Sequence, residues 1–103
     1  MRGMYDHMIE KPVLVRANRA GVYLGILLAT YPDGSLRIRA RRLHTFYGAM
    51  DSTTLALTGP SRGDIGPESD VLLRPGAEVI EIVAATDAAL ARCAAIPTWV
   101  SRP

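Results

Sequence analysis

Four arginines that follow the clearest turn signal of the chain carry its strongest candidate chemistry. Three of them alternate with apolar residues, so in a β-strand they would project from one side, and the fourth follows directly. Two aromatic residues come shortly afterwards. A guanidinium group offers a planar fork for phosphate, and an aromatic ring offers a flat apolar face for a base. We therefore predict a site for a small anionic, nucleotide-like ligand, formed by Arg37, Arg39, Arg41, Arg42, Phe46 and Tyr47.

The same arginines have a simpler interpretation, which stays open at this level. Like charges on one strand face repel by about a few tenths of a kcal/mol per pair, and water alone can relieve that repulsion. A solvated face is therefore one alternative. Acidic residues on a neighbouring strand, such as Glu78 and Glu81, are another.

The remaining polar residues form no catalytic or metal-binding pattern. His7 and His44 lack a carboxylate or second histidine at ligand spacing, and Cys93 is the only cysteine, which excludes an internal disulfide. Residues 59–66 are rich in glycine but have neither the spacing nor the lysine of a phosphate-binding loop. We expect no metal, no cofactor and no enzymatic activity, and we expect Cys93 to be a small buried hydrophobe.

Composition sets broad limits on the class of protein. The 103 residues suit a single domain, and 49% hydrophobic residues allow a packed core. A net charge of +2 is too weak to favour nucleic acid, and Lys11 is the one lysine among 12 basic residues, a bias that a GC-rich genome explains. No apolar run approaches the roughly 20 residues of a membrane helix. The sequence predicts a cytoplasmic location.

We expect a flexible or partner-ordered arm over residues 1–11 and one β-rich domain, which carries the arginines, over residues 12–103. Strands are predicted at residues 12–18, 22–31 and 35–43. The turn Pro32-Asp33-Gly34-Ser35 joins the last two into a hairpin, because proline fixes the first corner and Asp-Gly tolerates the reversal. Gly25 within the second strand indicates a bulge or a close backbone approach.

The second half of the chain alternates short elements with loops. Asp51 or Ser52 can cap a short helix through Leu57, with Gly59 as its C-terminal stop, although Thr53 and Thr54 also suit a strand. Residues 59–68 form a loop. Further strands are predicted near residues 69–73 and 77–84, and Thr86 caps a final helix from Asp87 to about Ala95. The predicted fold is mostly β in the α+β class: a small antiparallel sheet or partly closed barrel of about five strands, with a middle helix and a C-terminal helix.

The chain resembles an uncharacterised family of small proteins found mainly in bacteriophages and prophages. The resemblance runs from about Val13 to Val100 and is strongest at Ala40-Arg41-Arg42-Leu43-His44-Thr45-Phe46-Tyr47-Gly48-Ala49, Leu55-Ala56, Gly59, Glu81-Ile82, Thr86 and Pro97-Thr98-Trp99. It implies a phage-encoded origin and a compact β-rich fold, and it implies no activity. Family members usually carry Trp where His44 and Phe46 stand, so a ligand or partner at these positions would be bound with different specificity.

Two functions compete on this basis. The first is a phage-encoded accessory protein that binds a nucleotide-like ligand and sequesters a host immune signal. Its site would lie between the subunits of a homo-oligomer, because one small domain offers little concavity. The second is a structural or protein-interaction module, either a virion component or an inhibitor of a host protein. Nucleic-acid binding by the arginine strand is a third and less favoured possibility, and no contact with a membrane is expected.

Overall fold

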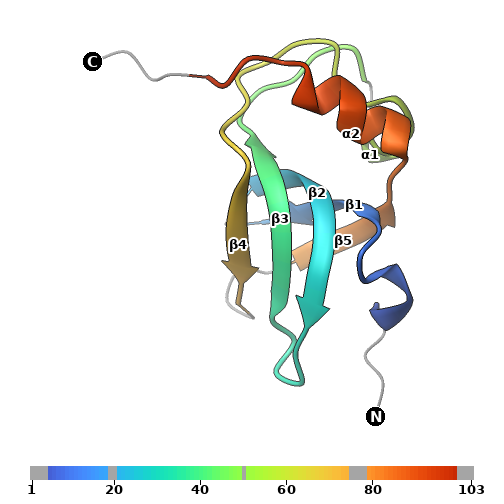
Figure 1. Cartoon of the computed structure of the whole chain (residues 1–103), viewed down its shortest axis with the longest axis vertical. Helices are drawn as coiled ribbons and strands as arrows, with labels where there is room; N and C mark the ends of the chain where they lie inside the picture. The colour runs from blue at the N-terminus through green and yellow to red at the C-terminus, as the bar shows by residue number, and fades with distance from the viewer. Residues whose placement is uncertain (1–4, 19–20, 50, 75–78, 100–103) are drawn as a thin grey trace.

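The computed structural model describes residues 5–18, 21–49, 51–74 and 79–99. These residues form a five-stranded antiparallel sheet with helices packed over one end (Figure 1). The strands are β1 (Pro12–Ala17), β2 (Gly21–Thr30), β3 (Leu36–Leu43), β4 (Ser69–Leu73) and β5 (Val79–Ala84). The helices are η1 (Asp6–Met8, a 3-10 helix), α1 (Ser52–Thr58) and α2 (Asp87–Ala94). This α+β architecture confirms the predicted fold class, and the sheet does not close into a barrel.

The strands lie in the order β4-β3-β2-β1-β5. The first four form a meander, and the fifth returns to pair with β1, so β4 and β5 are the two edges of the sheet. Irregular pairing interrupts the register between Arg16 and Ala17 and between Leu27 and Ala29. Such bulges increase the local twist of a strand. The sheet accordingly curls, and β1 and β5 pass behind β2 in Figure 1.

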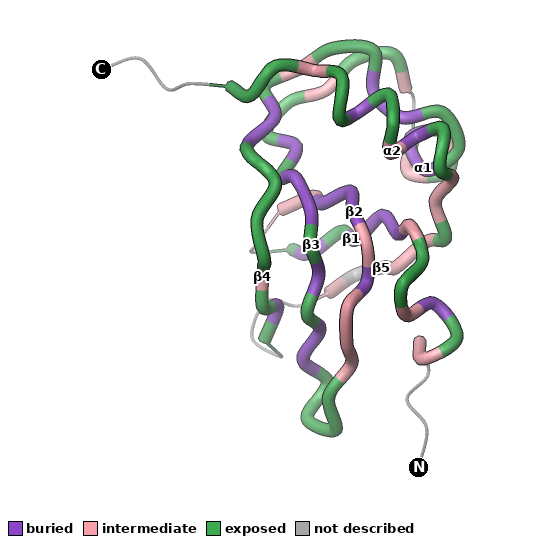
Figure 2. The backbone as a smooth tube through the Cα atoms, in the orientation of Figure 1, coloured by how far each residue is buried: buried purple, intermediate pink, exposed green. Residues whose placement is uncertain are grey.

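Alternation along the strands gives the sheet an inner face and an outer face, each with its own hydrophobic cluster. The inner cluster lies within the curl and includes Val13, Val15, Leu27, Ile38 and Leu73. The outer cluster lies between the upper part of the sheet and the helices, and it includes Leu14, Leu24, Leu43, Leu55, Ala89 and Cys93. Figure 2 shows this burial along the strands and on the helix sides that meet the sheet. The lower part of the outer face has no helix over it (Figure 1).

The hairpin between β2 and β3 forms as the sequence predicts. The amide of Tyr31 donates to the carbonyl of Ser35, and the amide of Gly34 donates back to Tyr31, each at 3.0 Å. Asp33 accepts a 2.8 Å hydrogen bond from the Ser35 amide, which closes the turn from inside. Gly34 has φ +90°, a conformation that favours glycine. This turn fixes the register that places the arginines of β3.

Side-chain caps define where both α-helices begin, as predicted. Asp51 accepts from the Thr54 amide at 2.8 Å, and Thr86 accepts from the Ala89 amide at 3.0 Å. Thr86 also donates its hydroxyl proton to the Leu57 carbonyl at 2.6 Å, which ties the start of α2 to the last turn of α1. The two helices therefore pack as one unit over the outer cluster. Cys93 is buried in the outer cluster, as expected.

The described part of the N-terminal segment packs against the sheet, which differs from the flexible arm predicted for residues 1–11. Met8 is buried in the inner cluster, with Tyr5 and Ile9 packed beside it. The Glu10 amide donates to Leu27, and the Leu27 amide donates to Lys11, so the segment continues the pairing of β2. Apolar residues at positions 5, 8 and 9 supply the burial that orders it.

None of the described helices is long and apolar enough to cross a membrane.

β2 and β3 approach each other closely at Gly25, where there is no room for a side chain. A Cβ atom at this position would lie 2.1 Å from the Arg39 carbonyl oxygen and 2.5 Å from the Ala40 Cα, which confirms the predicted close approach. We expect Gly25→Ala to lower the free energy of unfolding by about 1–3 kcal/mol, because backbone must move to admit the methyl group. Each kcal/mol lowers the melting temperature by roughly 4–8 °C in a domain of this size, which calorimetry can measure.

Gly66→Ala is the matched control for this substitution. The nearest atoms to a Cβ there, the Arg42 carbonyl oxygen and His44 Nε2, lie at 3.7 Å, and the backbone is not in the left-handed region. We expect this variant to melt close to the native protein. Equal losses for the two variants would contradict the close approach of β2 and β3.

Candidate functional site

The structure sorts the four arginines of β3 between the two faces of the sheet. Arg37, Arg39 and Arg41 share the outer face, which confirms the alternation predicted for them, while Arg42 belongs to the opposite face. The register pairs Arg41 with Leu24, Arg39 with Ile26 and Arg37 with Ala29. The three outer arginines therefore descend from the helix-covered end of the sheet toward the hairpin. Each of them meets a different environment.

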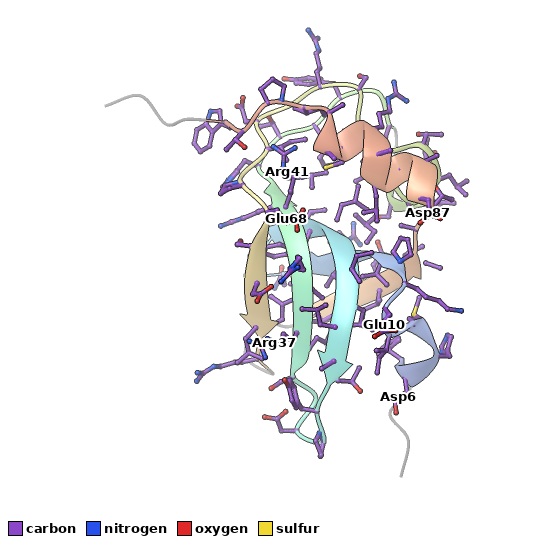
Figure 3. The ribbon with its side chains drawn as sticks, in the orientation of Figure 1. Asp6, Glu10, Arg37, Arg41, Glu68 and Asp87 are labelled. Atoms are coloured by element: carbon purple, nitrogen blue, oxygen red, sulfur yellow. The ribbon has the colours of Figure 1, made fainter. Side chains whose placement is uncertain are left out.

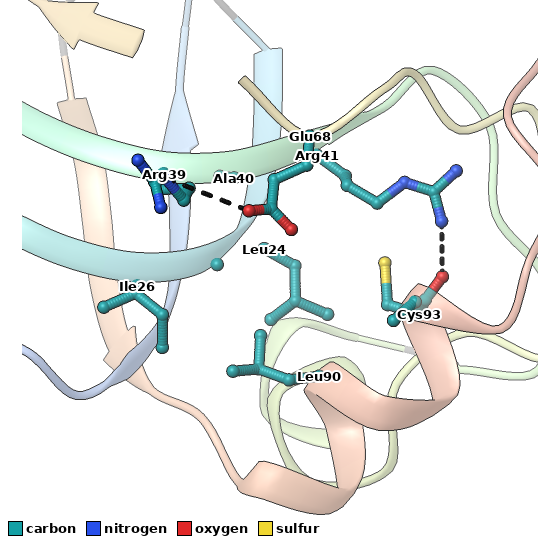
Figure 4. Close-up of a pocket in the computed structure, with 10 residues that line it drawn as sticks. Leu24, Ile26, Arg39, Ala40, Arg41, Glu68, Leu90 and Cys93 are labelled. Carbon is teal, nitrogen blue, oxygen red and sulfur yellow. Dashed lines mark hydrogen bonds and ion pairs between the residues drawn. The ribbon is translucent and has the colours of Figure 1, made fainter. Parts of the chain in front are cut away.

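Arg41 is a structural residue, because its guanidinium group is enclosed and its donors are used inside the protein. It is 8% exposed. Nε donates to the Gly66 carbonyl at 2.7 Å, Nη1 donates to the carbonyls of Cys93 at 2.6 Å and Ile96 at 2.7 Å, and Nη2 donates to Ile65 at 3.3 Å. Figure 4 shows the bond to the end of α2. An external phosphate has no access to this group.

Arg39 is exposed but already has acidic neighbours. Its Nε lies 3.2 Å from Asp70 Oδ1 and 3.9 Å from Glu68 Oε1. These carboxylates come from β4 and the residue before it, so the neighbouring acidic residues are not the expected Glu78 and Glu81. Glu81 pairs instead with Arg16 at 3.4 Å, and Glu78 lies outside the described residues. Exposed pairs of this kind contribute about 0–1 kcal/mol each, so an incoming anion would have to displace only a weak interaction.

Arg37 lies near the hairpin and has no hydrogen-bond or ion-pair partner among the described residues. It lines an open groove of about 610 Å³ that we call the hairpin groove. Two large apolar side chains stand exposed there, Tyr31 by 41% and Leu72 by 49%. Leu72 is the cross-strand neighbour of Arg37. The full lining of the hairpin groove is Tyr31, Pro32, Asp33, Ser35, Arg37 and Leu72.

Asp33 gives the rim of the hairpin groove a fixed negative charge. Hydrogen bonds from Ser35 hold the pKa of its carboxyl group below the ordinary value, and the positive charge of Arg74 lowers that pKa slightly further. Asp33 therefore stays ionised at neutral pH and can accept hydrogen bonds. The hairpin groove combines one guanidinium donor, one carboxylate acceptor and two apolar walls.

A second hollow, the helix cleft, lies between α2 and the outer face of the sheet (Figure 4). Its lining includes Leu24, Ile26, Arg39, Glu68, Leu90 and Cys93, and its volume is about 130 Å³. A cavity of roughly 150 Å³ holds a molecule the size of benzene, so the helix cleft is too small for a nucleotide. Burial raises the pKa of the Cys93 thiol, and the charge of Arg41 opposes this only in part. The thiol is accordingly uncharged at neutral pH and a poor nucleophile.

The two predicted aromatic residues lie at the other end of the sheet from Arg37. Six residues of extended strand separate Arg37 from Leu43, a length of about 20 Å. Phe46 is half-buried against the outer cluster, and Tyr47 is exposed with the Arg62 guanidinium 4.6 Å from its ring centre. The structure thus separates Phe46 and Tyr47 from the free arginine.

The aromatic side chain that does lie beside Arg37 is Tyr31. It was missed because it lies before the hairpin turn, whereas the predicted rings follow β3. The signal was present in the sequence, since the turn at residues 32–35 folds the end of β2 back beside the start of β3. Figure 3 shows Arg37 at this lower end of the sheet and Arg41 beneath the helices.

The described residues contain no group of three or more His, Cys, Asp or Glu side chains that could hold a metal ion. Comparison with known proteins found no matching family model, no similar curated protein and no similar solved structure. The resemblance to the phage family therefore stays a prediction. The geometry of the outer face is the evidence on which a function can be argued.

The different environments of Arg41 and Arg37 predict a large loss of stability when Arg41 is replaced and almost none when Arg37 is replaced. We expect Arg41→Met to lower the free energy of unfolding by about 3 kcal/mol or more, because the carbonyls of Gly66 and Ile96 lose the side-chain donor that Arg41 supplies and water can offset only part of the loss. Arg37→Met, the matched control on the same face, is expected to stay within about 0.5 kcal/mol of the native protein. Urea unfolding followed by circular dichroism measures both values. A similar result for the two variants would contradict the structural role of Arg41.

Proposed function

We propose that this protein binds a small anionic, nucleotide-like ligand, and that the hairpin groove is the site. The observation that carries the proposal is the exposed Arg37 guanidinium, without a partner in the described part of the chain, between the exposed side chains of Tyr31 and Leu72. A free guanidinium fork suits a phosphate group. A tyrosine ring suits the flat face of a base.

The size and polarity of the hairpin groove support a ligand of this class. Sites for small molecules commonly span about 300–1,000 Å³, with mostly apolar walls and a few polar groups that fix orientation. The hairpin groove, at about 610 Å³, falls in this range. Asp33 would accept hydrogen bonds from the hydroxyl or amino groups of a nucleoside, while Arg37 would hold the phosphate. A simple inorganic anion would leave the two apolar walls unused.

The biological role that we attach to this binding is sequestration of a host signalling nucleotide by a phage-encoded protein. Its support is the resemblance to a phage family together with the small size of the domain. The site differs from the one predicted from the sequence, since only Arg37 of the predicted residues lies in the hairpin groove.

A protein-interaction or structural module is the second candidate function. The observation that favours it is the edge of β4, which carries the exposed Leu72 and has no strand partner within the described part of the chain. Exposed edges and apolar side chains are what partner chains commonly use. Recovery of the protein in stoichiometric amount from purified virions, or with one host protein, would favour this candidate over ligand binding.

The ligand proposal is tested by titrating a panel of cyclic and adenosine-containing nucleotides. A bound nucleotide at a hundred times its dissociation constant would stabilise the folded protein by about 2.7 kcal/mol, which raises the melting temperature. We expect Arg37→Gln to weaken the affinity measured by calorimetric titration by roughly tenfold to a hundredfold, because one charge-assisted contact is lost.

Arg42→Gln is the control, because it removes another exposed arginine of the same strand from the opposite face. This variant is expected to keep its affinity for the nucleotide within about twofold of the native value. That result would show that the loss of one positive charge does not by itself explain the effect of Arg37→Gln. No thermal shift with any nucleotide at saturating concentration would refute the ligand proposal. Equal weakening by both substitutions would place the anion elsewhere.

A further inference from the structure

The free edge of β4 has a sequence that complements itself. In the order of strands β4 pairs only with β3, so the hydrogen-bonding groups along its other side have no strand partner among the described residues. Asp70 and Leu72 are exposed on the outer face, and Val71 and Leu73 point to the inner cluster. Arg74, exposed, follows directly. Lysines, prolines and bulges commonly block such an edge, and none occurs within residues 69–73.

We propose that two copies of this chain pair antiparallel along β4, with Leu72 of each copy opposite Leu72 of the other. A two-fold axis perpendicular to the sheet requires this antiparallel arrangement and keeps both outer faces on one side. In this register Asp70 faces Arg74 of the second copy, and Val71 faces Leu73 of the second copy. Over residues 70–74, each directly opposed pair is then either apolar with apolar or acidic with basic.

The contacts already present around β4 fit this arrangement. Asp70 lies 3.2 Å from Arg39 of its own chain, so Arg74 of the second copy would complete a row of alternating charge across the two sheets. Leu72 is 49% exposed, and pairing with its own counterpart would cover it. The pairing joins two five-stranded sheets into one continuous sheet and covers the β4 edge of each copy.

Neighbouring registers and the other edge of the sheet are less complementary. Centring the pair on Asp70 would oppose two carboxylates, and centring it on Val71 would oppose Asp70 with Leu72. On β5, an antiparallel pair centred on Glu81 would likewise oppose two carboxylates. The match of charge and apolarity therefore selects β4, with Leu72 at the centre.

This inference goes beyond the proposed ligand site, although the two share Leu72. In the pair, the hairpin grooves of both copies would lie on one face. The two Arg37 side chains would stand about 14 Å apart, three strand spacings, with the two leucines between them. A ligand carrying two phosphate groups could then contact both copies.

The experiment is a charge exchange at the two ends of the pairing, read by sedimentation equilibrium without any nucleotide. The native chain is expected to shift from one copy to two as its concentration rises. Asp70→Arg alone and Arg74→Asp alone each create two like-charge pairs. Each substitution should raise the dissociation constant of the homodimer by about tenfold or more.

An equimolar mixture of the two variants decides the register. One cross-strand pair then joins the two substituted positions and the other joins the two native residues, and both pairs have opposite charges. The mixture is therefore expected to dimerise about as tightly as the native chain. Failure of the mixture to recover dimers, or a native chain that stays monomeric at every soluble concentration, would overturn the proposal.

A second measurement keeps the register falsifiable if charge contributes little. Leu72→Cys places two thiols directly opposite each other, within the 4.4–6.8 Å that a disulfide bridges between Cα atoms, so oxidation should yield a covalent dimer. Asp70→Cys is the control and should not cross-link, because its two thiols would lie four residues apart along the strands. Cross-linking of the control alone would show another register. Since these assays contain no ligand, their outcome is separate from that of the nucleotide titration.

Discussion

The guanidinium group of Arg41 is the point where three parts of the chain that are distant in sequence meet. It projects from β3 toward the carbonyl groups of residues 65 and 66 in a loop, of residue 93 at the end of α2 and of residue 96 just beyond that helix. Carbonyl groups at a helix C-terminus carry partial negative charge and have fewer donors than those inside the helix, so a buried cation there donates to them and is stabilised by them. Lysine could not replace this planar fork, since the acceptors lie around it in several directions. The position of α2 over the sheet depends on this contact.

That position divides the outer face into a covered part and an open part, and the division determines the chemistry of each arginine. Arg41 lies under the helix and serves the fold, Arg39 lies at the margin beside Glu68 and Asp70, and Arg37 lies beyond the helix beside exposed apolar side chains. Three residues of one type, spaced identically along one strand, thus have three different roles. Their common spacing specifies only the face on which they lie.

The sequence was sufficient to predict the strands, the hairpin and both helix caps, because these depend on local signals such as Asp51, Thr86 and the turn at residues 32–35. It was insufficient to predict which arginine is buried, because the acceptors of Arg41 come from residues 52 and 55 positions further along the chain. Tyr31 was missed for a related reason. Its neighbour Leu72 is on β4, and only the tertiary pairing of β3 with β4 brings the two apolar side chains around Arg37. Met8 likewise needs the assembled inner cluster to be ordered.

The proposed ligand site and the proposed pairing edge are coupled through β4. Leu72 lines the hairpin groove and also stands at the centre of the proposed strand pairing, so a ligand that contacts it changes the surface offered to a second copy. If ligand binding favours the paired form, pairing must increase ligand affinity by the same factor, because the coupling free energy is shared by both equilibria. Sites for small molecules commonly enclose most of the ligand's surface, and a second chain beside the open hairpin groove would add walls without any change in the fold. The marginal burial of a domain of this size favours the same association.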